Sequence, residues 1–155
     1  MEMPKPGEQH KKLQAMVGQW VSEDKFHPTP WDPKGGMAKT SMNTRADLDG
    51  FFIISDAAQE RDGKVTYRGH GVFGYDGLQQ KYTMHWFDVM GFDPGPPALG
   101  TWEGNKLTFL HKHSMGSGRF TYEFDSPSTF RFKMERSQDG QTWMPFLDSV
   151  YRRVS

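Results

Sequence analysis

Apolar and charged side chains alternate along several stretches of this chain. In the clearest stretch, residues 130–135, apolar side chains occupy every second position and charged side chains lie between them. Residues 119–124 follow a similar scheme. A period of two is typical of a strand that buries one face and exposes the other, as strands of antiparallel sheets do. The pattern therefore predicts antiparallel strands.

Turn signals separate these stretches at short intervals. Asp-Gly pairs stand at residues 49–50, 62–63, 76–77 and 139–140, and such pairs between alternating segments favour hairpins. The segments between turn signals predict about ten strands, over residues 18–27, 38–47, 51–60, 64–75, 80–88, 99–104, 106–113, 118–125, 128–136 and 142–153.

A run of ten hairpin-linked strands has two open edges unless the sheet closes on itself. The expected fold class is therefore all-β, an up-and-down antiparallel barrel. One short N-terminal helix is expected before it, because Leu13 and Met16 follow helical spacing and Gly18 ends the pattern. We expect this helix to close one end of the barrel.

Two connections are longer than hairpin turns, residues 27–37 and 89–98. In an up-and-down barrel both emerge at the end opposite the helix, and they predict a mouth there. Each carries an aromatic side chain, Trp31 and Phe92. We expect these to pack under the prolines of their own loops, and a role as lid residues is the alternative.

Length and composition narrow the class of protein. A chain of 155 residues fits a single domain, residues 1–155, and the absence of cysteine excludes disulfides and thiolate metal sites. Nineteen basic and nineteen acidic residues are interspersed, which argues against a nucleic-acid partner. The polar N-terminus lacks a signal-peptide pattern, and the longest apolar run, residues 51–54, is too short to span a membrane. These features favour a cytoplasmic protein without a membrane partner.

The first strand opens with Gly18-x-Trp20. This motif resembles the start of calycins, the superfamily of lipocalins and fatty-acid-binding proteins, where it lies at the closed end of the barrel. The resemblance implies that a basic residue of the last strand, Arg152 or Arg153, packs on Trp20 as a cation–π pair. It also implies a lipocalin-like fold.

Four further segments, residues 27–33, 48–52, 69–76 and 84–88, are similar to a bacterial family known as domain of unknown function 1579. The combination spans most of the chain. This resemblance supports the fold, but the family has no established activity to carry over.

The alternation also predicts which side chains point into the barrel. On the apolar phase, Tyr122 lines the wall, while Trp86, Asp88 and His111 lie toward the mouth. An aromatic cavity with a few polar groups at its entrance is a common small-molecule site. We therefore expect these four residues to contact a small, partly apolar ligand; the alternative is that the aromatic side chains fill the barrel completely.

His70 and His85 form a second candidate site. With a four-residue hairpin loop over residues 76–79, the two histidines lie directly opposite each other on neighbouring strands. On the same phase both face outward, where they suit a pH-sensitive homodimer interface. A bulge in this hairpin would turn both into the barrel, as part of the ligand site.

Four functions remain open at this point. The leading one is ligand binding in the barrel; the others are an isomerase or hydrolase with a mouth histidine and Asp88, a homodimeric structural protein with a filled core, and a haem barrel like the nitrobindins. The last is disfavoured because residues 146–154 contain no histidine. His111 and His113 form a His-x-His pair without a forced third ligand, so neither a metal nor a cofactor is expected.

Overall fold

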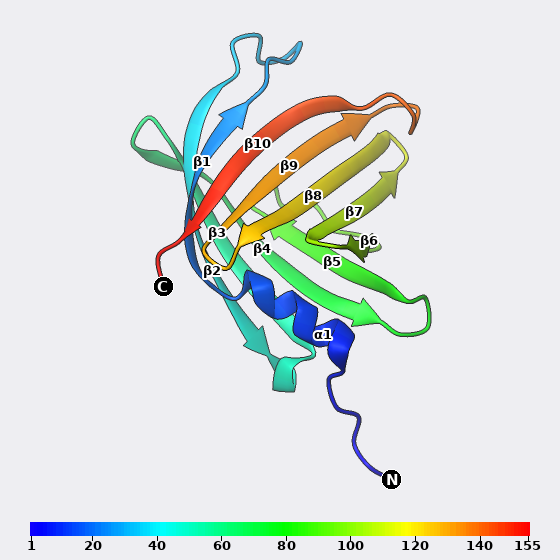
Figure 1. Ribbon diagram of the computed structural model, residues 1–155. Coiled ribbons are helices and arrows are strands. Elements are labelled where there is room, and N and C mark those ends of the chain that lie inside the picture. Colours follow the sequence, from blue (N-terminus) through cyan, green and yellow to red (C-terminus); the bar gives the residue numbers. More distant parts are fainter.

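The computed structural model describes residues 1–155 and shows a closed antiparallel barrel in which each strand pairs with its neighbours in sequence and β1 pairs with β10 (Figure 1). The strands are β1 (Gly18–Phe26), β2 (Gly36–Asp47), β3 (Phe52–Arg61), β4 (Lys64–Asp76), β5 (Lys81–Asp88), β6 (Ala98–Glu103), β7 (Lys106–His113), β8 (Gly116–Ser126), β9 (Thr129–Ser137) and β10 (Met144–Arg153). All ten expected strands are present, with ends that differ by two residues at most. The predicted fold class is confirmed.

The end of the barrel that carries the N-terminal helix is the base (Figure 1). The helix α1 (Glu8–Lys12) continues into a 3₁₀ turn, η1 (Leu13–Met16), whose Leu13 and Met16 are fully buried. A further 3₁₀ turn, η2 (Leu48–Gly50), joins β2 to β3. None of the helices has the length and apolar character that a membrane span requires. The two apolar side chains of η1 close the base.

Trp20 anchors the start of β1 to this base. Its indole Nε1 donates a hydrogen bond to the Met16 carbonyl at 3.0 Å. The guanidinium of Arg153 lies 4.3 Å from the centre of the Trp20 ring, and its Nη1 donates to the carbonyl of Val17. The predicted cation–π pair is therefore formed by Arg153 and not by Arg152, which points outward to Glu23.

Large side chains fill the base half of the interior. Phe130 is the centre of this packing: its ring stacks on Tyr151 at 4.6 Å and meets Trp20 edge to face at 4.7 Å. The side chains buried to at least 99 % here are Leu13, Met16, Trp20, Ile53, Phe73, Leu107, Phe109 and Phe130. Edge-to-face and stacked contacts between such rings add to the hydrophobic stabilisation from burial.

The two long loops lie at the opposite end, the mouth. Trp31 in the β1–β2 loop is 5.8 Å from the guanidinium of Arg136 at the end of β9, and Pro96 in the β5–β6 loop accepts a hydrogen bond from His111 near the end of β7. Trp31 is 67 % exposed and Phe92 is 79 % exposed. The expectation that both rings pack under their own prolines is wrong, because both remain largely exposed to solvent.

Candidate functional site

The mouth half of the barrel interior is lined differently from the base. Its apolar side chains Trp86, Phe120, Phe132 and Met134 lie on the inward phase of their strands, yet each is only half-buried. Phe120 and Phe132 pack against the core cluster on one side. The mouth half is therefore less completely sealed from solvent than the base.

Small residues face the interior on β3 and β4 in this half of the barrel. Ala57 lies opposite Gly69, and Ser55 lies opposite Gly71, all on the inner face. The Trp86 indole covers both glycines: a Cβ at Gly69 would approach the ring to 2.5 Å, and a Cβ at Gly71 to 2.9 Å. Gly69 and Gly71 therefore make room for the Trp86 ring.

A buried carboxylate lies on the inner face of β1. Asp24 is 0 % exposed. Its Oδ1 accepts a hydrogen bond from Ser22, and its Oδ2 accepts from Thr40, both at 2.6 Å. The Gln59 side-chain amide donates a third hydrogen bond to Oδ2 at 3.1 Å. All three donors are uncharged, so Asp24 has hydrogen-bond partners but no counterion.

A second polar cluster continues from Gln59 across β4 and β5. Tyr67 is the cross-strand neighbour of Gln59; its hydroxyl accepts a hydrogen bond from Trp86 Nε1 at 2.7 Å and donates one to Asp88 Oδ2 at 2.8 Å. Burial, with a smaller effect of Asp88, raises the pKa of Tyr67, so the phenol stays neutral and remains a donor. We call the set Ser22, Asp24, Thr40, Gln59, Tyr67 and Asp88 the inner polar belt.

Of the residues expected to contact a ligand, two lie together. Trp86 and Asp88 are joined through Tyr67 at the mouth. His111 is half-buried on β7, and its Nε2 bonds to the Pro96 carbonyl at 3.2 Å. No hydrogen bond or ion pair joins His111 to Asp88, whose carboxylate is held by Tyr67 and the Met90 amide. The structure therefore does not pair His111 with Asp88; the mouth histidine that meets an aspartate is His27, whose Nε2 lies 2.8 Å from Asp148 Oδ2.

Tyr122 lies deeper, in the packed core. It is buried, its hydroxyl points at the sulfur of Met84 at 3.9 Å, and burial strongly raises its pKa. Its ring contacts Phe132 at 4.9 Å. Tyr122 thus forms the floor of the mouth half.

His70 and His85 do not face each other. His70 pairs with Phe87, and His85 pairs with Val72, because the β4–β5 loop spans residues 77–80 and not 76–79. The Asp76 side chain fixes that loop by accepting hydrogen bonds from the amides of Leu78 and Gln79. A register shift of two keeps the face unchanged, so both histidines still point outward.

The outward side of β4 carries one further pair. His70 bonds through Nδ1 to the Asp56 carboxylate on β3, and 67 % of its side chain is exposed. A small hollow of about 250 Å³ lies beside it, lined by Arg68, Gly69, His70, Phe87, Asp88 and Val89. His111 and His113 lie with ring centres 5.6 Å apart, and no three histidine or carboxylate groups converge to hold a metal ion.

Five of the six belt residues were not predicted from the sequence, namely Ser22, Asp24, Thr40, Gln59 and Tyr67. Asp24 was detectable, because Trp20, Ser22 and Asp24 alternate on one face of β1 and the Gly-x-Trp motif places Trp20 inside. Gln59 and Tyr67 depend on a register irregularity at Gln59/Glu60 that aligns them across β3 and β4. No feature of the sequence predicts that irregularity.

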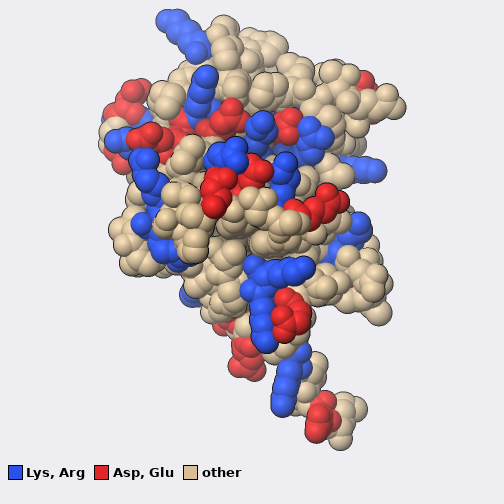
Figure 2. Space-filling view, viewed as in Figure 1, with Lys and Arg blue, Asp and Glu red and all other residues tan.

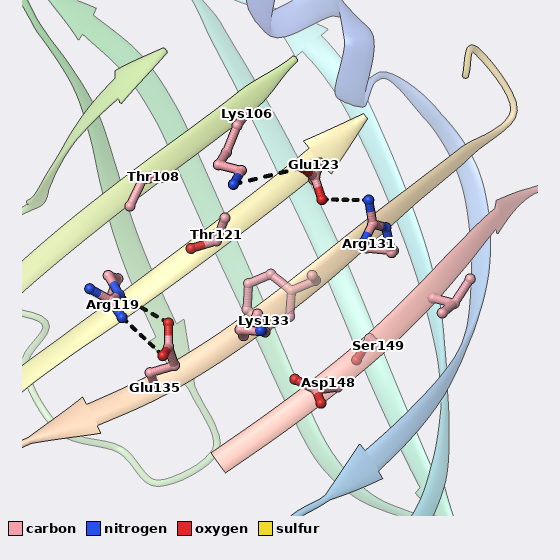
Figure 3. A pocket seen from close by; sticks show the side chains of 12 residues that line it. Lys106, Thr108, Arg119, Thr121, Glu123, Arg131, Lys133, Glu135, Asp148 and Ser149 are labelled. Atoms are coloured by element: carbon pink, nitrogen blue, oxygen red, sulfur yellow. Dashed lines mark hydrogen bonds and ion pairs between the residues drawn. The ribbon is translucent and has the colours of Figure 1, made fainter. Parts of the chain in front are cut away.

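A polar groove of about 600 Å³ crosses the outer surface of β7–β10, and we call it the outer groove (Figure 3). Its floor is the cross-strand row Thr108, Thr121 and Lys133. Bidentate Arg119–Glu135 hydrogen bonds at 2.9 Å form one side. Positive and negative side chains interleave over this face of the molecule (Figure 2), as expected of a solvated sheet face.

The other side of the outer groove is a three-residue ion-pair network. Glu123 on β8 forms ion pairs with Lys106 from β7 and Arg131 from β9 (Figure 3). Such exposed pairs contribute little stability, about 0–1 kcal/mol each. Their mutual neutralisation leaves Lys133 as the groove's one cation without an ion pair.

Four features together define a calycin-like barrel. They are the closed base, the Gly-x-Trp motif at the start of β1, the arginine of β10 that packs on Trp20, and the ten strands that pair in sequence order. The chain belongs to the family described as "Protein of unknown function (DUF1579)", whose model matches residues 5–153. No curated protein matches the chain.

Two solved structures share the fold. Rv2717c from M. tuberculosis is similar with a TM-score of 0.71 and 12 % identity, over 96 % of this chain and 99 % of that one. The S-type phycobiliprotein lyase CpeS from Guillardia theta is similar with a TM-score of 0.65 and 9 % identity, over 95 % of this chain and 93 % of that one. Identities this low establish the common fold and nothing about activity.

Proposed function

We propose that this protein binds a small, partly apolar molecule in the mouth half of the barrel. The observation that carries the proposal is the set of inward-facing but half-buried side chains Trp86, Phe120, Phe132 and Met134. Side chains in a filled interior are sealed, as Phe130 and Phe109 are at the base. Apolar surface left open to water is stabilised when a ligand covers it.

The composition of the wall supports this choice of ligand. Aromatic rings offer apolar contact area, while the inner polar belt provides a few fixed hydrogen-bonding groups on the same surface. Such a mixture is typical of small-molecule sites, in which apolar contacts provide affinity and a few polar groups set orientation. The long loops at the mouth leave Trp31 and Phe92 exposed above the entrance.

The proposal can be tested with Nile red, an uncharged dye whose fluorescence rises in apolar surroundings. We expect saturable binding at one dye per chain. Ala57 and Ala58 offer a matched pair, because Ala57 lies opposite Gly69 inside the barrel and Ala58 lies opposite Arg68 outside it. Ala57→Leu should weaken dye binding about tenfold because the larger side chain fills the site. It should lower the free energy of unfolding by no more than about 1–3 kcal/mol.

The control is Ala58→Leu, which adds the same atoms to the outer face and should leave the affinity unchanged. Circular dichroism and urea denaturation establish that both variants are folded at the titration temperature. Absence of saturable binding to the native protein, or equal loss in the two variants, would contradict a site inside the barrel.

A further inference from the structure

Two carboxylates face the mouth half of the interior without a counterion. Asp24 accepts hydrogen bonds only from Ser22, Thr40 and Gln59, and Asp88 accepts only from Tyr67 and the Met90 amide. Neither takes part in any of the chain's ion pairs. A charge removed from water is costly unless it is paired or fully hydrogen-bonded.

A buried hydroxyl beside Asp24 also lacks a partner. Ser149 on β10 is the direct cross-strand neighbour of Asp24, both on the inner face, and it is 3 % exposed. Its Oγ makes no hydrogen bond within the protein. Directly opposed side chains have Cβ atoms about 5 Å apart. A single donor group placed between the two residues can therefore satisfy the hydroxyl oxygen and the carboxylate together.

Gln59 is the one Asp24 partner that keeps contact with solvent. It is the half-buried member of the three Asp24 partners, while Ser22 and Thr40 are buried. Its hydrogen bond to Asp24 is also the longest of the three, 3.1 Å against 2.6 Å. A neutral amide on a flexible side chain is the partner that a charged donor most easily replaces.

From these observations we propose that the ligand carries a positively charged amine, and that this ammonium group binds at Asp24 and Ser149 in place of the Gln59 amide. An ammonium group has three donors and no acceptor. One N–H donates a hydrogen bond to a carboxylate oxygen of Asp24, and a second donates to the hydroxyl oxygen of Ser149. Asp88, on the belt closer to the loops, adds a second negative charge along the path of entry. The inference rests on the proposed function, since it names the polar end of the same ligand.

Two arginines at the rim of the mouth offer the competing assignment. Arg136 lies over Phe146 at 4.4 Å, and Arg61 lies over Phe26 at 4.7 Å. Arg61 is engaged by Asp32 and by the Gly35 carbonyl. These guanidinium groups are stacked on rings of the rim, whereas Asp24 is inside the wall. An anionic ligand would use the rim, and an ammonium ligand the interior.

Three ligands with the same ten-carbon chain separate these assignments: decylamine, decan-1-ol and decanoate. Each is titrated below its micellar concentration at pH 7 and followed by tryptophan fluorescence and calorimetry. We expect the amine to bind about tenfold or more tightly than the alcohol, the ratio given by one added hydrogen bond to a charged group. Decanoate should bind more weakly than the alcohol.

Two substitutions locate the effect. Asp24→Asn keeps the shape and removes the charge, so it should abolish the preference for the amine and leave decan-1-ol binding in place. Ser149→Ala removes a hydroxyl that has no partner and should not lower stability, so it stays informative if Asp24→Asn fails to fold. It should reduce the preference several-fold. The control is Asp56→Asn, which neutralises an outward-facing carboxylate beside His70. It should leave the preference for the amine over the alcohol unchanged.

The outcomes are distinct. If none of the three ligands binds the native protein, the proposed function fails. If the alcohol binds but the amine has no advantage, or decanoate binds best, the barrel holds a ligand and the ammonium assignment is overturned. A preference for the amine that survives both Asp24→Asn and Ser149→Ala also overturns it.

Discussion

The two halves of the barrel interior are built on the same ten strands but filled with different side chains. At the base, aromatic rings and the residues of η1 pack until Trp20, Phe109 and Phe130 are sealed from water. At the mouth, the inward positions are occupied by small or polar residues and by aromatic side chains such as Trp86 that remain half-buried. Apolar burial is therefore concentrated at the base, whereas the polar and half-buried side chains lie at the mouth.

The difference appears most clearly along β1. The inward residues in order are Trp20, Ser22 and Asp24. Three successive inward positions thus change from a large aromatic side chain to a small polar one and then to a carboxylate. All three are buried. Strands that alternate in this way need strong packing at one end, because the polar end contributes little hydrophobic stabilisation. The predictions below test whether the two halves differ energetically as they differ in composition.

The largest effect is expected at the centre of the base. Phe130→Ala should lower the free energy of unfolding by about 3–5 kcal/mol, because the site is closed on all sides by rings that cannot collapse into the space. Phe120→Ala, at the half-buried level of the mouth, should cost about half as much, since less surface is sealed and water can enter. Urea denaturation followed by circular dichroism gives both values. Equal costs would show that the mouth half is packed like the base.

A smaller effect is expected where a ring lies on bare backbone. Gly69→Ala places a Cβ against the Trp86 indole, at 2.5 Å before relaxation, and should destabilise the protein by about 1–3 kcal/mol. The matched control is Gly77→Ala in the β4–β5 loop, where a Cβ meets nothing within 4 Å and the change should stay within about 0.5 kcal/mol. If Gly69→Ala is equally neutral, the mouth half holds enough room for Trp86 to move aside freely.

The same contrast explains how much of the molecule could be predicted from its sequence. Alternation and turn residues are local, so the ten strands, the closed base and the inward phase of Trp86 and Asp88 were correctly predicted. Pairing is not local. His70 was placed opposite His85 and lies opposite Phe87, because the Asp76 side chain holds a loop that begins one residue later than expected.

Asp24 shows a different reason for a missed residue. Its position on the inner face follows from Trp20, but its importance depends on Thr40 and Gln59, which come from two other strands. The sequence patterns that attract notice, paired histidines and aromatic runs, describe single strands. A site assembled from one or two residues of each strand leaves no such pattern and becomes visible only once the register is known.

The smallest effect concerns the hydroxyl that joins Trp86 to Asp88. Tyr67→Phe removes the hydroxyl that Trp86 and Asp88 share. It should lower the free energy of unfolding by about 1 kcal/mol, because water that reaches the mouth replaces part of the lost hydrogen bonding. Tyr75→Phe is the control, since the Tyr75 hydroxyl has no hydrogen bond in the structure, and its effect should stay within about 0.5 kcal/mol. The same denaturation experiment applies to both. A loss of about 3 kcal/mol or more at Tyr67 would mean that Asp88 is left buried and unpaired, and the mouth half would then be a sealed polar core instead of a surface open to a ligand.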